Sequence, residues 1–281
     1  MHSKLHLLII DPQNDFCDVP AAYRPGDLVP ALPVPGAHAD MLRVAELIRF
    51  GGQGLHGVSV TMDAHHRLDI AHPTFWIGGD GAAVPSFTQI GAAAVRSGTY
   101  LPRAGDALPR VLAYLDALEM GGRYGLMVWP VHCEIGSWGQ LVHADVRAAC
   151  DGWEADGHRV NIVEKGGNQW TEHYSAVMAE VPDPDDPATQ LNQGLIDVLA
   201  AADRVYIAGE AGSHCVKATT EHIVACFGPE KLGKLVLVTD CISPVTGFEP
   251  QYQDFLAAMR ARGVRTARSA EVLAELIANG E

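Results

Sequence analysis

Three side chains that could act together in catalysis each follow a short apolar segment of the sequence. They are Asp11, Lys165 and Cys215, a carboxylic acid, an amine and a thiol. A thiolate can attack an electrophilic carbon, a carboxylate can take and return its proton, and an ammonium can stabilise the developing negative charge. These residue types predict nucleophilic catalysis by cysteine, provided that the fold brings the three positions together.

Cys215 lies where an apolar run ends and a helical pattern begins. Ser213 is a candidate N-cap, apolar residues follow Cys215 at helical spacing, and Gly228 ends the pattern. The free N–H groups of a first helical turn and the helix dipole favour a thiolate and can hold an oxyanion. A small buried hydrophobe is the alternative role of a cysteine, and we assign it to the other five.

Lys165 and Asp11 would assist the thiol. Lys165 precedes two glycines that let the backbone pass close to a ligand, and its charge would lower the pKa of a neighbouring thiol. Asp11 would carry a proton between the thiol and a leaving group. Each residue has an ordinary alternative role: a lysine is commonly a solvated surface residue, and an aspartate commonly forms a turn.

A second group of polar residues suggests a metal site. Asp63 and His65 lie two positions apart after an apolar segment, and His132 follows the next one. One carboxylate and two imidazoles suit zinc, iron(II) or manganese and leave coordination positions open. His66 and His72 are further candidate ligands, although a loop histidine is more often a polar surface residue.

Alternating apolar and amphipathic segments must position these residues. The apolar, β-branched segments are 5–10, 57–62, 125–129, 160–164, 205–208 and 235–239, and the principal amphipathic ones are 39–50, 105–120, 193–203 and 250–263. This alternation predicts an α/β fold, a doubly wound, mostly parallel six-stranded sheet with helices on both faces. Ligands of such sheets bind beyond the carboxyl ends of the strands, where the polar residues above would meet.

We expect one domain over residues 1–281. The aromatic segment 66–104 breaks the alternation and is predicted to be an insertion at the active site, while the Pro-rich segments 18–36 and 181–189 are predicted loops. The tail, 250–281, is predicted to form a helix, a strand and a last helix.

Composition excludes several classes of function. The chain has 281 residues, 48% of them hydrophobic, and a net charge of −14, which would repel nucleic acid. No apolar run is long enough for a membrane span or a signal peptide, so we expect a cytoplasmic protein without a membrane partner. Its six dispersed cysteines are expected to be reduced.

The sequence resembles the isochorismatase-like cysteine hydrolases, and among them the metal-containing nicotinamidases. The motifs that carry the resemblance occur in the family's order between positions 7 and 220: LLIIDPQNDFC, TMDAHH, WPVHCEIGSWG, EKGGNQWTEHYSA and GEAGSHCVKATT. The resemblance implies a catalytic triad of Asp11, Lys165 and Cys215. It also implies a divalent metal, zinc before iron or manganese, held by Asp63, His65 and His132.

The same resemblance implies further features of the site. A cis peptide bond would precede Ala211, and the N–H groups of Ala211 and Cys215 would form an oxyanion hole. Phe16, Trp129 and Tyr174 match the aromatic residues that enclose a substrate ring. Ser213 departs from the family, in which an aspartate is common at this position, and the segment between His72 and Trp129 is longer than in compact nicotinamidases.

The implied reaction is hydrolysis of a small, nicotinamide-like amide through a thioester, with release of ammonia and a metal that positions the substrate. Another small amide or carbamoyl compound, or an isochorismatase-type reaction, is the nearest alternative. A non-haem metal oxygenase or a non-catalytic binding protein is a more distant one. A dinucleotide-dependent oxidoreductase would need a glycine-rich turn after an early strand, which the sequence lacks. The oligomeric state stays open, a homo-oligomer included.

Overall fold

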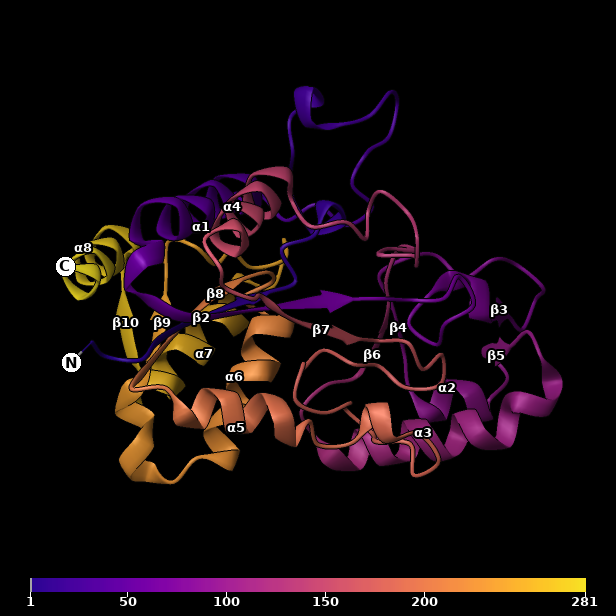
Figure 1. Ribbon diagram of the computed structural model, residues 1–281. Helices are drawn as coiled ribbons and strands as arrows, with labels where there is room; N and C mark the ends of the chain where they lie inside the picture. Colours follow the sequence, from indigo (N-terminus) through magenta and orange to yellow (C-terminus); the bar gives the residue numbers. More distant parts are fainter. Residues whose placement is uncertain (1) are drawn as a thin grey trace.

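A six-stranded parallel sheet forms the centre of the protein, with helices on both faces (Figure 1). The computed structural model describes residues 2–281, and the strand order is β10-β9-β8-β1-β2-β7. Every pairing within this sheet is parallel. The strands are β1 (Leu5–Ile10), β2 (Leu55–Asp63), β7 (Asn161–Lys165), β8 (Arg204–Gly209), β9 (Leu235–Val238) and β10 (Arg265–Ala267). The predicted fold class is confirmed.

Strand β1 is central, and apart from His6 its residues are apolar. All six of its residues are buried, and burying one such aliphatic side chain contributes about 1.5–3 kcal/mol. Its neighbours are β2 and β8, and the register pairs Ile10 with Gly209. On the far side of β2, Asp63 pairs with Lys165. The carboxyl ends of four strands therefore reach one edge of the sheet together.

Helices cover the two faces of this sheet (Figure 1). One face carries α1 (Ala37–Gly51), α4 (Ala144–Ala155) and α8 (Ser269–Gly280), and the other carries α5 (Gln193–Ala201), α6 (Cys215–Cys226) and α7 (Glu249–Ala261). In α1, Met41, Val44 and Ile48 follow helical spacing and are buried. Among residues 2–281, no helix has both the length and the apolar character needed to cross a bilayer.

Residues 70–128 build a separate structure beside the sheet, at the right of Figure 1. Its elements are β3 (Trp76–Gly78), β4 (Thr88–Ile90), α2 (Ala92–Arg96), β5 (Tyr100–Pro102), α3 (Leu108–Gly121) and β6 (Leu126–Val128). Strand β3 pairs with β5 and β4 with β6, all antiparallel, around a second hydrophobic cluster. The insertion at 66–104 and the single domain stay predictions.

The predicted strand at 125–129 does not belong to the central sheet. Leu126 and Val128 are buried in the second cluster, where the pairing of β6 with β4 holds them. The sixth place in the sheet belongs to β10, a short edge strand from the tail. The pairing with β4 therefore decides to which sheet this apolar segment belongs. Its apolar character alone does not reveal that sheet.

Gly209 allows β8 to approach the end of β1. Its φ is +113°, and a Cβ atom there would lie 2.0 Å from the Ile10 carbonyl oxygen. We expect Gly209→Ala to lower the free energy of unfolding by roughly 3 kcal/mol or more, since backbone has to move.

Gly26→Ala is the matched control. Gly26 also has a positive φ, +59°, but no atom lies within 4 Å of the added methyl group. We expect it to cost about 1 kcal/mol. Urea denaturation of both variants measures the difference, and equal losses would contradict the proposed close contact.

Candidate active site

The structure brings Asp11, Lys165 and Cys215 together at the carboxyl edge of the sheet. Asp11 directly follows β1, Lys165 is the last residue of β7, and Cys215 is the first residue of α6. The Lys165 Nζ atom lies 2.9 Å from Asp11 Oδ2 and 3.7 Å from Cys215 Sγ. All three side chains are buried.

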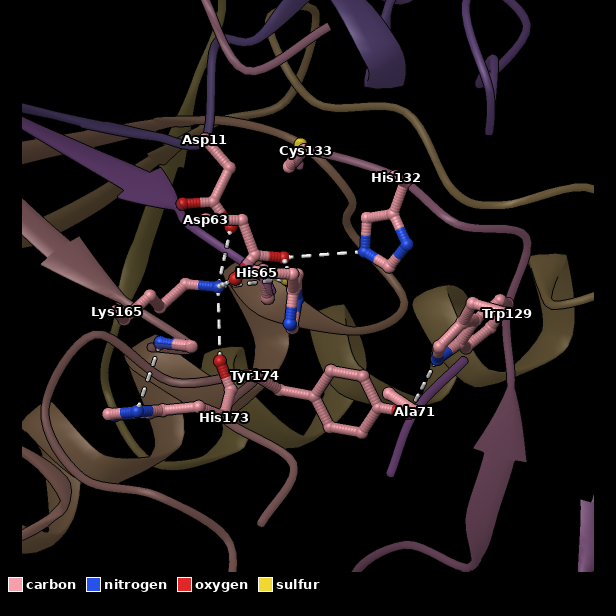
Figure 2. A network of polar contacts seen from close by, with 12 residues as sticks. Asp11, Asp63, His65, Ala71, Trp129, His132, Cys133, Lys165, His173 and Tyr174 are labelled. Atoms are coloured by element: carbon pink, nitrogen blue, oxygen red, sulfur yellow. Dashed lines mark hydrogen bonds and ion pairs between the residues drawn. The ribbon is translucent and has the colours of Figure 1, made fainter. Parts of the chain in front are cut away.

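Lys165 also reaches the second group of polar residues (Figure 2). Its ammonium lies 2.8 Å from Asp63 Oδ1 and donates a hydrogen bond of 3.0 Å to the His173 carbonyl oxygen. Burial would lower the pKa of Lys165, but the carboxylates of Asp11 and Asp63 outweigh it and raise the pKa well above its usual value. The lysine therefore stays charged inside the protein.

Burial has the largest effect on the pKa of the Cys215 thiol. Burial raises its pKa well above the usual value, and although Lys165 opposes this effect, Asp11 and Asp63 add to it. The lowering of this pKa by Lys165, which the sequence predicts, is therefore outweighed by burial and two carboxylates. The ligand atoms of Asp11, Asp63 and Cys215 lie within 4.8 Å of one another, so a base is available for the thiol proton.

Asp11 is suited to exchange a proton. Its Oδ1 accepts a hydrogen bond of 2.6 Å from Thr61 Oγ1, which fixes the carboxyl group. Burial raises the pKa of Asp11, and Lys165 partly opposes that rise. An aspartate with a raised pKa holds a proton more readily than a solvated one, as a general acid and base requires.

Two imidazoles converge on one oxygen of Asp63. Asp63 Oδ2 lies 3.2 Å from His65 Nε2 and 3.5 Å from His132 Nε2, and all three side chains are buried. His65 Nε2 has no hydrogen-bond partner among the described residues. A divalent cation would satisfy such a set of one carboxylate and two imidazole donors, so these residues fit the metal that the resemblance implies.

The structure separates the two further histidine candidates. His72 Nε2 lies 3.3 Å from His132 Nδ1, and burial followed by the nearby His132 and His65 lowers the pKa of His72 to about 2. This neutral imidazole could act as a fourth ligand. His66 is exposed and lies outside the group.

Sequence reasoning missed Asp69. Its Oδ2 lies 3.1 Å from His65 Nδ1 on the side opposite to Asp63, which fixes the ring orientation in the way that carboxylates support metal-bound histidines. The spacing of four residues from His65 was the available signal.

The three predicted aromatic residues line one small pocket. Phe16, Trp129 and Tyr174 surround a cavity of about 20 Å³, and the indole of Trp129 donates a hydrogen bond of 3.0 Å to the Tyr174 hydroxyl. The thiol of Cys215 and the Asp63 group border the same cavity. Four further residues of its wall were not predicted: Leu32, Glu172, His214 and Val245.

Glu172 is the most unusual of these wall residues. It is buried, and its Oε2 has no hydrogen-bond partner among residues 2–281. Burial raises the pKa of Glu172 to about 7. The sequence offered no signal for it beyond its place within the motif after Lys165.

The segment between β8 and α6 carries the predicted oxyanion hole. The Glu210–Ala211 peptide bond is cis, as expected. Within the described chain, neither the Ala211 N–H nor the Cys215 N–H donates to another group, while the Ala211 oxygen accepts from the N–H groups of His214 and Val216. Two backbone donors are thus free beside the thiol.

The predicted N-cap at Ser213 is wrong. Helix α6 has His214 at its N-cap position, without a side-chain cap. Ser213 Oγ instead accepts a hydrogen bond of 3.1 Å from the Val245 N–H. The hydroxyl group therefore joins this segment to the neighbouring loop.

Comparison with known proteins supports the fold. No family model and no curated protein matches the sequence. A yeast nicotinamidase superposes with a TM-score of 0.63 at 19% identity, covering 94% of this chain and 99% of the other. A pyrazinamidase of Pyrococcus horikoshii, solved in complex with zinc, gives 0.53 at 19%, covering 94% and 99%. An isochorismatase-like hydrolase from Alkaliphilus metalliredigens gives 0.53 at 15%, covering 97% and 98%. The chain thus has the α/β fold shared by nicotinamidases and isochorismatase-like hydrolases.

Proposed function

We propose that the protein is a cysteine-dependent amidohydrolase that releases ammonia from a small, neutral, nicotinamide-like amide. The observation that carries this proposal is the position of the Lys165 ammonium, 2.9 Å from Asp11, 2.8 Å from Asp63 and 3.7 Å from Cys215. This ammonium connects the nucleophile and its base with the candidate metal ligands, and all of them lie at one pocket. The shared fold with nicotinamidases supports the same reaction class.

The first half of the reaction forms an acyl-enzyme. Asp11 takes the proton of the Cys215 thiol as the amide binds, and the sulfur attacks the carbonyl carbon. Lys165 stabilises the negative charge on the sulfur and on Asp63 throughout. The N–H groups of Ala211 and Cys215 hold the oxyanion of the tetrahedral intermediate.

The second half releases the acid. Asp11 returns its proton to the leaving nitrogen, the C–N bond breaks, and ammonia departs from a Cys215 thioester. Asp11 then removes a proton from water, whose oxygen attacks the thioester carbonyl. The C–S bond breaks, the sulfur regains a proton, and the carboxylic acid leaves, which gives ping-pong kinetics.

Asp63, His65 and His132 would hold a divalent metal, with zinc first because it favours imidazole and carboxylate donors. Asp69 would orient His65, and His72 lies close enough to add a fourth ligand. Such an ion supplies a Lewis acid that can bind a ring nitrogen of the substrate. A zinc complex of a structural neighbour, the Pyrococcus horikoshii pyrazinamidase, supports this choice of metal.

The charge of the pocket favours a neutral substrate. The ionisable wall residues include the acids Asp63 and Glu172, and the nearby Lys165 is already paired with two carboxylates. The metal proposed at Asp63 would offset that carboxylate, so Glu172 is the acid that an anionic carbamoyl compound would meet without a paired cation. A metal oxygenase would leave the group of Asp11, Lys165 and Cys215 unused, and isochorismatase-type ether hydrolysis needs no cysteine. Cytoplasmic location and oligomeric state stay predictions.

Replacing the nucleophile tests the mechanism. We expect Cys215→Ala to lower kcat for ammonia release from nicotinamide by roughly a thousandfold or more, because the acyl-enzyme cannot form. Cys226→Ala is the matched control, since Cys226 is an exposed free thiol. Unchanged ammonia release by the Cys215 variant would rule out covalent catalysis at this residue.

Metal analysis tests the proposed ligands. We expect the purified protein to contain about one equivalent of a divalent metal, and His132→Ala to lose most of it because one of the imidazole donors is removed. His66→Ala, at an exposed histidine, should keep the metal. Elemental mass spectrometry measures both, before and after dialysis against a chelator. Equal metal loss in the two variants would contradict the assignment.

A matched substrate pair tests the charge of the pocket. Maleamide and maleamate share a carbon skeleton, but only maleamate carries a carboxylate. We expect kcat/KM for maleamide to exceed that for maleamate by about tenfold or more, since one uncompensated like-charge contact costs at least about 1.4 kcal/mol. Nicotinamide is the reference substrate in the same ammonia assay. A preference for maleamate would favour the carbamoyl alternative.

A further inference from the structure

Glu210 is a buried acid next to the free N–H of Ala211. It is the last residue before Ala211, and its side chain has no exposed surface. Its Oε2 accepts a hydrogen bond of 3.2 Å from the Ser243 N–H. Ser243 also binds the carboxyl group of Asp40, a buried residue of α1 that lies within hydrogen-bonding reach of Glu210.

Two carboxyl groups in contact need a proton between them. The Arg43 guanidinium lies 2.6 Å from Asp40 Oδ1, and the Ser243 hydroxyl donates a hydrogen bond of 2.6 Å to Asp40 Oδ2. Asp40 is thus satisfied as an anion. Glu210 Oε1, in contrast, receives no hydrogen bond from any described residue. Because an ionised carboxylate can only accept, Glu210 Oε1 is the atom that can carry the shared proton.

We propose that Glu210 stays protonated in the folded protein, donates a hydrogen bond to Asp40, and through this acid pair positions the segment that holds the oxyanion. Glu210 is a positioning residue here and does not touch the substrate. Its link to catalysis rests on the proposed function, while its protonation does not.

The surroundings of Glu210 favour the neutral form. Burial, followed by the charge of Asp40, raises the pKa of Glu210 well above its usual value. The pKa of Asp40 is also raised by burial, but hydrogen bonds from Ser243 and Arg43 oppose the rise. The other titratable groups that face the pair are Cys17 and Asp18 after β1, Asp240 and Cys241 after β9, and Tyr252 of α7. Arg43 is the only cation in this set, and it is bound to Asp40.

Ser243 transmits the position of the acid pair to the pocket. Its N–H binds Glu210, its hydroxyl binds Asp40, and its carbonyl oxygen accepts a hydrogen bond of 2.8 Å from the Gly212 N–H. Ala211 and Val245, the residues that flank these contacts, both line the cavity. Loss of the pair would therefore shift an oxyanion donor and one wall of the pocket.

Unfolding as a function of pH tests the proton directly. Glu210→Gln keeps a donor for Asp40 and an acceptor for Ser243, but it cannot ionise. A glutamate that is neutral when folded loses its stabilising effect as pH rises above its unfolded pKa of about 4.3, because only the unfolded chain releases the proton. We expect the melting temperature of Glu210→Gln to rise relative to wild type by roughly 2–4 °C per unit between pH 5 and 8.

Glu164→Gln, at an exposed glutamate, is the matched control and should show no such trend. A melting-temperature difference for Glu210→Gln that is constant with pH would overturn the neutral assignment. This measurement needs no substrate, so its result is independent of the proposed function. A failure to release ammonia from any amide would refute the proposed function but not the protonation of Glu210.

Kinetics test the positioning role. Glu210→Leu can neither bind Ser243 nor donate to Asp40, and we expect it to lower kcat by about tenfold or more with KM within threefold, since displaced catalytic groups lose rate. Glu210→Gln should keep kcat within threefold. If Glu210→Leu does not fold, Ser243→Ala is the milder variant to test. We expect it to lower kcat severalfold. Wild-type kcat in Glu210→Leu, or in Ser243→Ala, would overturn the positioning role.

Discussion

The site depends on one buried cation. The ammonium of Lys165 is held by two carboxylates and a carbonyl oxygen, and removal of one member of such a buried group commonly costs about 3–5 kcal/mol. The same three contacts join the two halves of the site, because Asp11 lies beside Cys215 and Asp63 lies beside the histidines. Strand register makes this possible, since Asp63 and Lys165 are paired residues at the ends of β2 and β7.

Much of the fold and part of the site could be predicted from the sequence. The short apolar run at 5–10 favours a buried strand, and the rule that ligand-binding residues follow the strands of a parallel sheet placed Asp11, Lys165 and Cys215 together. The position of β6 could not be predicted, because a three-residue apolar strand fits either sheet. The pair of Asp40 and Glu210 was equally hidden, since 170 positions separate two acids that only tertiary packing brings into contact.

The pKa of the Cys215 thiol shows the same limit. A helix start near a lysine predicts a lowered thiol pKa, and Lys165 does have that effect on Cys215. Complete burial and the charges of Asp11 and Asp63 reverse the result, and neither can be read from local sequence.

The walls of the pocket come from parts of the chain that are far apart, among them Leu32 of the Pro-rich loop and Trp129, which directly follows β6. A cavity of about 20 Å³ holds a water molecule but not an aromatic ring. A ring-sized ligand would therefore need these walls, which are anchored on separate elements, to move apart. Part of the binding free energy would then be spent on that opening, and association would be slower than simple diffusion allows.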